Sequence, residues 1–159
     1  MPTLVQRLIE QLLLLPHPEG GYYRETYRSE LQVHSDNVGA LRPALTDIYF
    51  LLPAGQVSRW HRVRHDELWN FYAGAPLVLW QLSPDLAQLS CRRLDPRSGQ
   101  FKLLVPAGCW QAAESTGDYS LVGCTVAPGF DFADFRLLRE LPEIAARIYA
   151  EYPETAKFI

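Results

Sequence analysis

The sequence predicts an all-β fold in which antiparallel strands form a closed barrel or two packed sheets, as in a jelly roll. Three observations support this prediction. Between residues 22 and 126 the apolar residues occur in short runs that are rich in β-branched and aromatic side chains. Turn sequences separate these runs, and helical periodicity appears only near the two ends of the chain. The pattern indicates one antiparallel domain with short terminal helices.

Nine segments have the length and composition of strands. They cover residues 22–27, 46–52, 57–62, 68–72, 77–82, 89–93, 101–105, 110–114 and 119–126. Glycine and proline mark the turns between them, most clearly at Gly74-Ala75-Pro76 and Asp95-Pro96-Arg97-Ser98-Gly99. The polar stretch 29–43 is the longest candidate loop. It either covers the mouth of the barrel or is a surface excursion between strands.

Helical patterns are confined to the chain ends. Thr3 and Gln6 have the spacing of a capping box, and apolar residues at positions 4, 8, 9, 12 and 15 follow helical periodicity. They predict a helix over about residues 3–15. Pro142 suits the first turn of a second helix, over about residues 141–151. Because no linker is visible, residues 1–159 are predicted to form one domain with the barrel at about residues 20–138.

Composition excludes several classes of function. Fifteen Lys and Arg against eighteen Asp and Glu give a net charge of −3, which argues against a nucleic-acid partner. Arg7 and Glu10 interrupt the apolar residues near the N-terminus, so we expect neither export nor membrane insertion. Cys91, Cys109 and Cys124 are odd in number and widely spaced, which is typical of reduced packing residues in a cytoplasmic protein.

The segment from Gly55 to Gly74 reads Gly55-x5-His61-x-Val63-x3-Glu67-x6-Gly74. This spacing resembles the first signature of the cupin superfamily, except that valine stands where that signature has its second histidine. Side chains alternate along a strand, so His61 and Val63 point the same way, and a turn can bring Glu67 back beside them. An imidazole and a carboxylate are therefore expected to meet in one place.

A second segment, Pro106-x-Gly108-x2-Gln111, resembles the second cupin signature with glutamine in place of its histidine. Valine cannot bind a metal, and an amide oxygen is a weak ligand for zinc or iron. We therefore predict no metal and no other cofactor. The alternative is a metal bound by His61, Glu67 and Gln111.

Longer stretches of the sequence narrow the resemblance from the cupin superfamily to one family within it. Residues 16–29, which begin Pro16-His17-Pro18-Glu19-Gly20-Gly21, together with 46–52, 58–69 and 105–137, resemble the cupin family once catalogued as domain of unknown function 985. The resemblance implies a double-stranded β-helix, the cupin or RmlC-like jelly roll. It also implies a homodimer similar in fold to sugar-nucleotide epimerases. It does not supply an established activity.

The leading functional hypothesis is a barrel pocket for a polar small molecule such as a carbohydrate. His61 is the predicted general base and Glu67 its orienting or acid partner, since imidazole titrates near neutrality. The reaction would be a metal-independent epimerisation or isomerisation. The alternatives are a non-enzymatic ligand-binding protein and a metal-dependent oxygenase or isomerase. The predicted ligand-binding residues are Ser58, Trp60, Tyr72 and Gln111, although tryptophans at such positions often pack in a core or a dimer interface.

Two groups of arginines have no role in the hypotheses above. Arg24 and Arg28 lie four apart on a predicted strand and should share one face, with Glu25 opposite. They would bind an anionic substrate, pair with Glu25 and Glu19 or, as we prefer, contribute to a dimer contact. The cluster of Arg59, Arg62 and Arg64 forms either a small anion site or a solvated rim.

Overall fold

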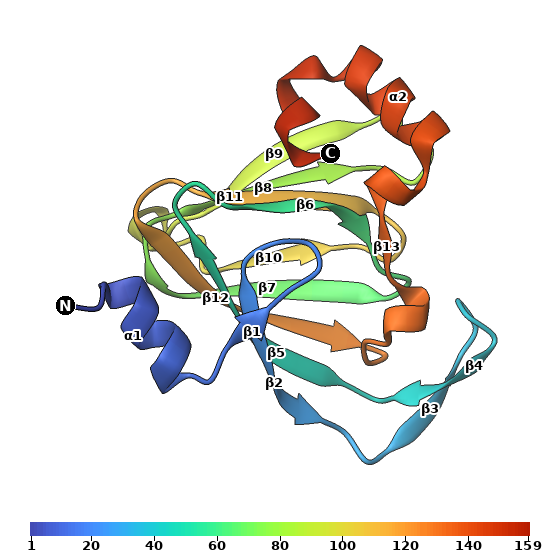
Figure 1. The fold of residues 1–159 in the computed structure, drawn as a ribbon. Coiled ribbons are helices and arrows are strands. Elements are labelled where there is room, and N and C mark those ends of the chain that lie inside the picture. The colour runs from blue at the N-terminus through green and yellow to red at the C-terminus, as the bar shows by residue number, and fades with distance from the viewer.

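The computed structural model describes residues 1–159 and consists of two antiparallel sheets that pack face to face (Figure 1). The larger sheet has six strands in the order β1 (Leu15–Pro16), β2 (Tyr22–Arg28), β5 (Thr46–Pro53), β12 (Tyr119–Ala127), β7 (Asp66–Gly74) and β10 (Lys102–Val105). The smaller has five, in the order β13 (Arg136–Leu137), β6 (Val57–Arg62), β11 (Trp110–Ser115), β8 (Leu77–Leu82) and β9 (Leu89–Leu94). The predicted all-β jelly roll is confirmed.

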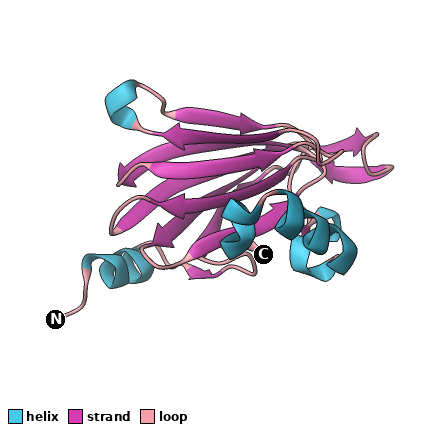
Figure 2. Cartoon of the chain, turned by 90° about the horizontal axis from the view of Figure 1, so that it is seen from above, coloured by secondary structure: helices cyan, strands magenta, loops and turns pink.

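Helices lie at the periphery of the strand layers, as the view from above shows (Figure 2). Neither α1 nor α2 is long and apolar enough to cross a membrane. The helices are α1 (Leu4–Gln11) and α2 (Pro142–Glu151), with short 3-10 helices η1 (Pro96–Ser98), η2 (Phe132–Asp134), η3 (Leu138–Glu140) and η4 (Pro153–Phe158).

The N-terminal helix is shorter than its sequence pattern. The predicted capping box is present, since Gln6 N–H donates to the Thr3 hydroxyl and Thr3 N–H donates to the Gln6 side chain. The helix ends at Gln11 because Leu13 adopts a positive φ of 54° and redirects the chain toward β1. Leu14 is then buried with Leu51 and Leu121 on the outer face of the larger sheet.

All nine predicted strands are present with boundaries close to those predicted, whereas four further strands escaped prediction. Strands β1 and β13 have two residues each and form only by pairing with β2 and β6. The predicted loop over residues 29–43 is in fact a hairpin of β3 (Gln32–Ser35) and β4 (Ala40–Pro43). This hairpin extends from the barrel as an arm (Figure 1). Its side chains are mostly solvated, so it lacks the apolar alternation by which strands are recognised.

The main core lies between the two sheets. Phe50, Trp69 and Leu79 are almost completely buried there. Along their strands, side chains that point into this core alternate with side chains that point outward. A second core covers the outer face of the smaller sheet, where Trp60 and Trp110 pack beneath α2 and η4. Beside the main core, polar and apolar side chains of both sheets line a cavity.

Candidate functional site

A cavity of about 520 Å³ opens between the two sheets. Strands β2, β5, β6, β7 and β12 contribute to its wall, as do the loop before β2 and the loop before β13. Its polar lining includes His17, Glu19, His61 and Glu67. Its apolar wall includes Tyr23, Ile48, Val63, Val126, Phe130, Phe132 and Phe135. A few polar groups among apolar walls are the usual composition of a small-molecule site.

His61 on β6 is buried and forms two hydrogen bonds. Its Nδ1 lies 2.7 Å from the Arg59 carbonyl oxygen, and its Nε2 lies 2.7 Å from Glu19 Oε2. Burial alone would lower the pKa of His61, but the adjacent Glu19 carboxylate raises it above its ordinary value. Burial alone would raise the pKa of Glu19, but the imidazoles of His61 and His17 lower it. The pair is therefore an imidazolium and a carboxylate, and both ring nitrogens of His61 donate.

A tight turn before β2 delivers Glu19 to this position. Gly20 has a φ of 107°, and a Cβ there would lie 2.1 Å from the Val57 carbonyl oxygen, so only glycine fits. The turn is tied to β6, because Arg59 N–H donates to the Glu19 carbonyl at 2.7 Å. His17 Nδ1 accepts from Glu19 N–H at 3.1 Å. Burial lowers the pKa of His17, so its ring is neutral with the proton on Nε2.

Glu67 on β7 has a different set of partners. The side-chain amide of Gln111 donates to Glu67 Oε2, and Trp69 Nε1 donates to Gln111 Oε1 at 2.8 Å. The indole thus fixes which end of the Gln111 amide faces the carboxyl group. Burial raises the pKa of Glu67 to about 7, against the opposing charge of His61. Burial and the Glu67 carboxyl also raise the pKa of Cys124 well above its ordinary value, so this thiol stays protonated.

The sequence matches the family described as "Cupin superfamily (DUF985)" over residues 6–138. The chain belongs to this cupin family. It is 28% identical to an uncharacterised protein of Saccharomyces cerevisiae over 90% of this chain and 79% of the yeast protein. Among solved structures, a hypothetical protein from Leishmania major is 32% identical, with a TM-score of 0.82 over 96% of this chain and 94% of that one. A protein from Shewanella oneidensis is 37% identical, with a TM-score of 0.79 over 99% and 94%.

A more distant structure shares only the fold of this cupin. Oxalate decarboxylase from Bacillus subtilis, in a mutant form, is 12% identical, with a TM-score of 0.58 over 87% of this chain and 34% of that one. Such a likeness confirms the two-sheet architecture. It assigns no activity to the cavity.

The partner of His61 differs from the one expected from the cupin spacing. We expected Glu67 to orient His61, but no hydrogen bond joins them, and Glu19 occupies the Nε2 side of the ring. His61 and Glu67 nevertheless line the same cavity. Sequence reasoning missed Glu19 and His17 as site residues. Both lie in the segment Pro16–Gly21, where two polar residues directly precede a pair of glycines, and that combination was the available signal.

The four predicted ligand-binding residues do not line the cavity of this cupin. Trp60 points to the opposite face of β6 and packs against Phe158, because strand residues alternate and its neighbour His61 points inward. Tyr72 lies on the outer face of the larger sheet beside Tyr49, and 47% of it is exposed. Ser58 is fully buried and lies outside the cavity lining. Gln111 acts on the cavity only through Glu67.

A β-bulge overturns the expected arrangement of Arg24, Glu25 and Arg28. The register of β2 against β5 shifts between Glu25 and Tyr27, so the residues after Thr26 change face. Arg28 consequently lies beside Glu25 and donates to both of its carboxylate oxygens at 2.8 Å. The Arg24 guanidinium instead lies over the Tyr49 ring, 5.7 Å from its centroid.

The donor set of the cavity does not fit the metal of other cupins. Val63 offers only carbon, and both nitrogens of His61 are taken by hydrogen bonds. The Gln111 oxygen accepts from Trp69, and its amide group faces Glu67. No three His, Cys, Asp or Glu side chains are grouped as a metal site. These residues therefore do not fit a bound transition metal.

Chelation is expected to leave the stability of this cupin unchanged. Protein purified without added metal should contain well under one transition metal per chain, and treatment with EDTA should not shift its melting temperature, because a ligand that is not bound cannot stabilise the fold. Elemental analysis and thermal unfolding before and after chelation measure both quantities. A stoichiometric metal that survives dialysis would contradict the expectation.

Proposed function

We propose that this cupin binds a small polar molecule with a carbonyl group, such as a sugar, and catalyses its epimerisation or isomerisation without a metal. Proton transfer occurs at the carbon beside the carbonyl, with Glu67 as the acid–base group. One observation carries the proposal: the Glu67 carboxyl group lines the cavity and has a pKa of about 7. A general base works best when its pKa lies near the operating pH.

In the proposed reaction the Glu67 carboxylate removes a proton from the carbon beside the carbonyl. The electron pair of that C–H bond forms a carbon–carbon double bond, and the carbonyl oxygen takes up negative charge as an enolate. The Nε2–H of His17 is free to donate to that oxygen, and the positive charge of His61 stabilises it electrostatically. In an isomerisation, Glu67 returns the proton to the former carbonyl carbon, the hydroxyl group on the first carbon loses its proton to become the new carbonyl, and the enolate oxygen takes up a proton to become a hydroxyl group. In an epimerisation, the enolate turns over in the cavity before Glu67 returns the proton, so that the proton is added to the opposite face and the carbonyl forms again.

This assignment exchanges the roles expected from the sequence. His61 donates through both nitrogens and has no lone pair with which to accept a proton. It serves as a fixed positive charge, and Glu67 serves as the base. Aromatic rings in the apolar wall, including Phe130 and Phe135, suit the C–H face of a sugar ring.

A ligand screen followed by isotope exchange tests the proposal. Sugars, sugar nucleotides and hydroxy acids are screened by thermal shift, and each molecule that stabilises the protein is incubated with it in D₂O. We expect deuterium to enter the carbon beside the carbonyl, observed by proton NMR. Binding without exchange would refute catalysis and would indicate a non-enzymatic ligand-binding protein. A Glu25→Gln variant is a matched control, because Glu25 lines the mouth of the cavity but is paired with Arg28.

We further propose that the protein is a cytoplasmic homodimer. The three free cysteines, one of them exposed, suit a reducing compartment. Strand β1 pairs with β2 only at Tyr22 and Tyr23, so the rest of this edge of β2 has no strand beside it. Tyr27 on that edge is 55% exposed. An open edge with exposed tyrosine and arginine favours pairing with a second copy.

Light scattering at micromolar concentration is expected to give twice the mass of one chain. A Tyr27→Glu variant should shift the species toward monomer, because it places a buried charge in the proposed contact. Circular dichroism on the variant shows whether the fold is retained. A wild-type protein that is strictly monomeric would contradict the proposal.

A further inference from the structure

Three arginines converge on the outside of the wall whose inner side lines the cavity. Arg62 and Arg64 flank Val63, and Arg136 is the cross-strand partner of Arg62 where β13 pairs with β6. Val63 and Phe135 line the cavity, whereas the arginines lie around a separate hollow of about 370 Å³. The two spaces share no lining residue.

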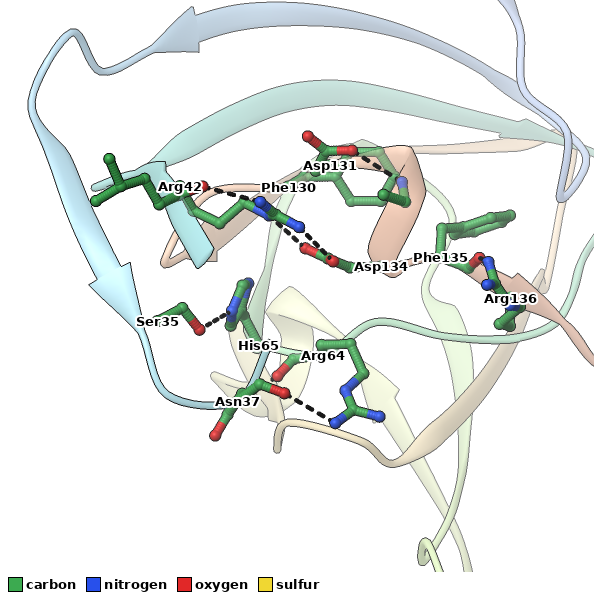
Figure 3. A network of polar contacts seen from close by, with 12 residues as sticks. Ser35, Asn37, Arg42, Arg64, His65, Phe130, Asp131, Asp134, Phe135 and Arg136 are labelled. Carbon is green, nitrogen blue, oxygen red and sulfur yellow. Dashed lines mark hydrogen bonds and ion pairs between the residues drawn. The ribbon is translucent and has the colours of Figure 1, made fainter. Parts of the chain in front are cut away.

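None of the three arginines has an acidic partner. Arg64 donates to the Asn37 carbonyl oxygen at 2.8 Å, and Arg136 donates to the Phe135 carbonyl oxygen at 2.8 Å. The Nε of Arg62 is buried without any hydrogen-bond partner. Figure 3 shows Arg64 and Arg136 near the Arg42–Asp134 pair. Arg59, the remaining arginine of the cluster noted in the sequence, donates instead to the Ile159 carbonyl oxygen.

The one carboxylate in the hollow is already neutralised. Asp134 accepts from Arg42 Nε and Nη2, each at 2.8 Å, in a bidentate pair. The arm formed by β3 and β4 thus supplies the counter-charge of Asp134. The positive charges of the three arginines of the hollow are therefore not balanced by this carboxylate. A bidentate pair is the strongest arrangement available to a carboxylate and a guanidinium, so Asp134 is not free to serve a second arginine fully.

Like charges directly opposite each other on paired strands are destabilising. The Arg62 guanidinium lies over the Trp110 ring, 4.8 Å from the centroid, and this contact favours its position beside Arg136. Burial and the charges of Arg64 and Arg136 lower the pKa of Arg62. The arrangement therefore holds a concentrated positive charge in place without a neutralising group from the chain.

We infer that the hollow formed by Arg62, Arg64 and Arg136 is a binding site for a phosphate group. Guanidinium groups match the oxygens of phosphate in pairs, and three of them around one hollow can neutralise a dianion. Free phosphate and the phosphate group of a small phosphomonoester present the same chemistry. Because the hollow is separate from the cavity, the inference does not depend on the proposed reaction.

Thermal unfolding and calorimetric titration with inorganic phosphate test the site. Phosphate should raise the melting temperature of the wild-type protein above that seen in sodium chloride of equal ionic strength. Arg64→Gln and Arg136→Gln should each weaken phosphate binding at least about tenfold, since each removes a charged hydrogen-bond donor. Both side chains are exposed, so neither substitution disturbs a core.

Arg139→Gln is the matched control, because Arg139 is an exposed arginine on η3 outside the hollow. It makes the same change in net charge and should leave phosphate binding unchanged. Equal loss of binding in Arg136→Gln and Arg139→Gln, or a wild-type response no larger than that to chloride, would overturn the inference. Glycerol phosphate is titrated in parallel. Tighter binding than phosphate identifies a phosphomonoester as the ligand, and binding no tighter identifies free phosphate.

Discussion

Replacing Glu67 by glutamine is expected to lower turnover by about 10²–10⁴-fold, the usual contribution of a general base. Glutamine has nearly the same shape and can still accept from the Gln111 amide, so the hydrogen-bonded chain from Trp69 survives. What is lost is the group that takes and returns a proton. Wild-type turnover should rise with pH through about 7, because the base must be ionised, whereas the variant should show no such step.

The same substitution changes how stability depends on pH. The pKa of Glu67 is about 7 in the folded protein against an ordinary value of 4.5, so the folded state binds the extra proton between these values. Its stabilising contribution is full below pH 4.5 and is lost as the pH rises through 7. Over that range the wild type should lose about 3 kcal/mol relative to Glu67→Gln.

Rates of deuterium exchange and chemical unfolding at several pH values measure both effects. Glu25→Gln removes a carboxylate of the cavity mouth and serves as the control for each. Retained turnover in a folded Glu67→Gln variant, with an unchanged pH profile, would show that the proton is moved by another group.

Replacing Glu19 by glutamine is expected to destabilise the fold by about 3 kcal/mol, because it leaves the buried imidazolium of His61 without its counter-charge. The cost lies at the lower end of the range for such losses, since His61 can relieve it by releasing its proton. Nearby Gly20 and the backbone bond between Arg59 and Glu19 are unaffected, so the turn itself should persist.

The pH range in which Glu19→Gln destabilises the fold follows from the pKa shifts of His61 and Glu19. The pKa of His61 is raised above 6.5, so its contribution is present below that pH and is lost as the pH rises through the raised value. The pKa of Glu19 is lowered below 4.5, so its contribution is present above that pH and is lost as the pH falls. The destabilisation should therefore be largest between pH 4.5 and 6.5.

A double-mutant cycle isolates the pair. Unfolding free energies are compared for the wild type, Glu19→Gln, His61→Gln and the double variant. In the His61→Gln background Glu19→Gln should cost much less than in the wild type, because no imidazolium is left unpaired. Equal costs in the two backgrounds would show that Glu19 and His61 do not interact.

Local sequence was sufficient for the strands and for part of the site. Alternation and turn residues depend on neighbours within a few positions, and they predicted all nine of the longer barrel strands. The cupin spacing placed His61 and Glu67, which line one cavity. These features are local because each strand face is specified by a period of two residues. The β3–β4 hairpin was missed for the same reason, since its solvated residues carry no such period.

The chemistry of the site was decided by tertiary structure. Glu19 reaches His61 only because a turn before β2 folds onto β6, with the arm and β5 between them in the chain. One extra residue at Thr26 reverses the face of Arg28, and no pattern in the sequence marks it. The protonation of His61 and Glu67 depends on burial and on which charges lie within a few ångströms. Those distances are set by how distant segments pack, so a sequence read locally does not contain them.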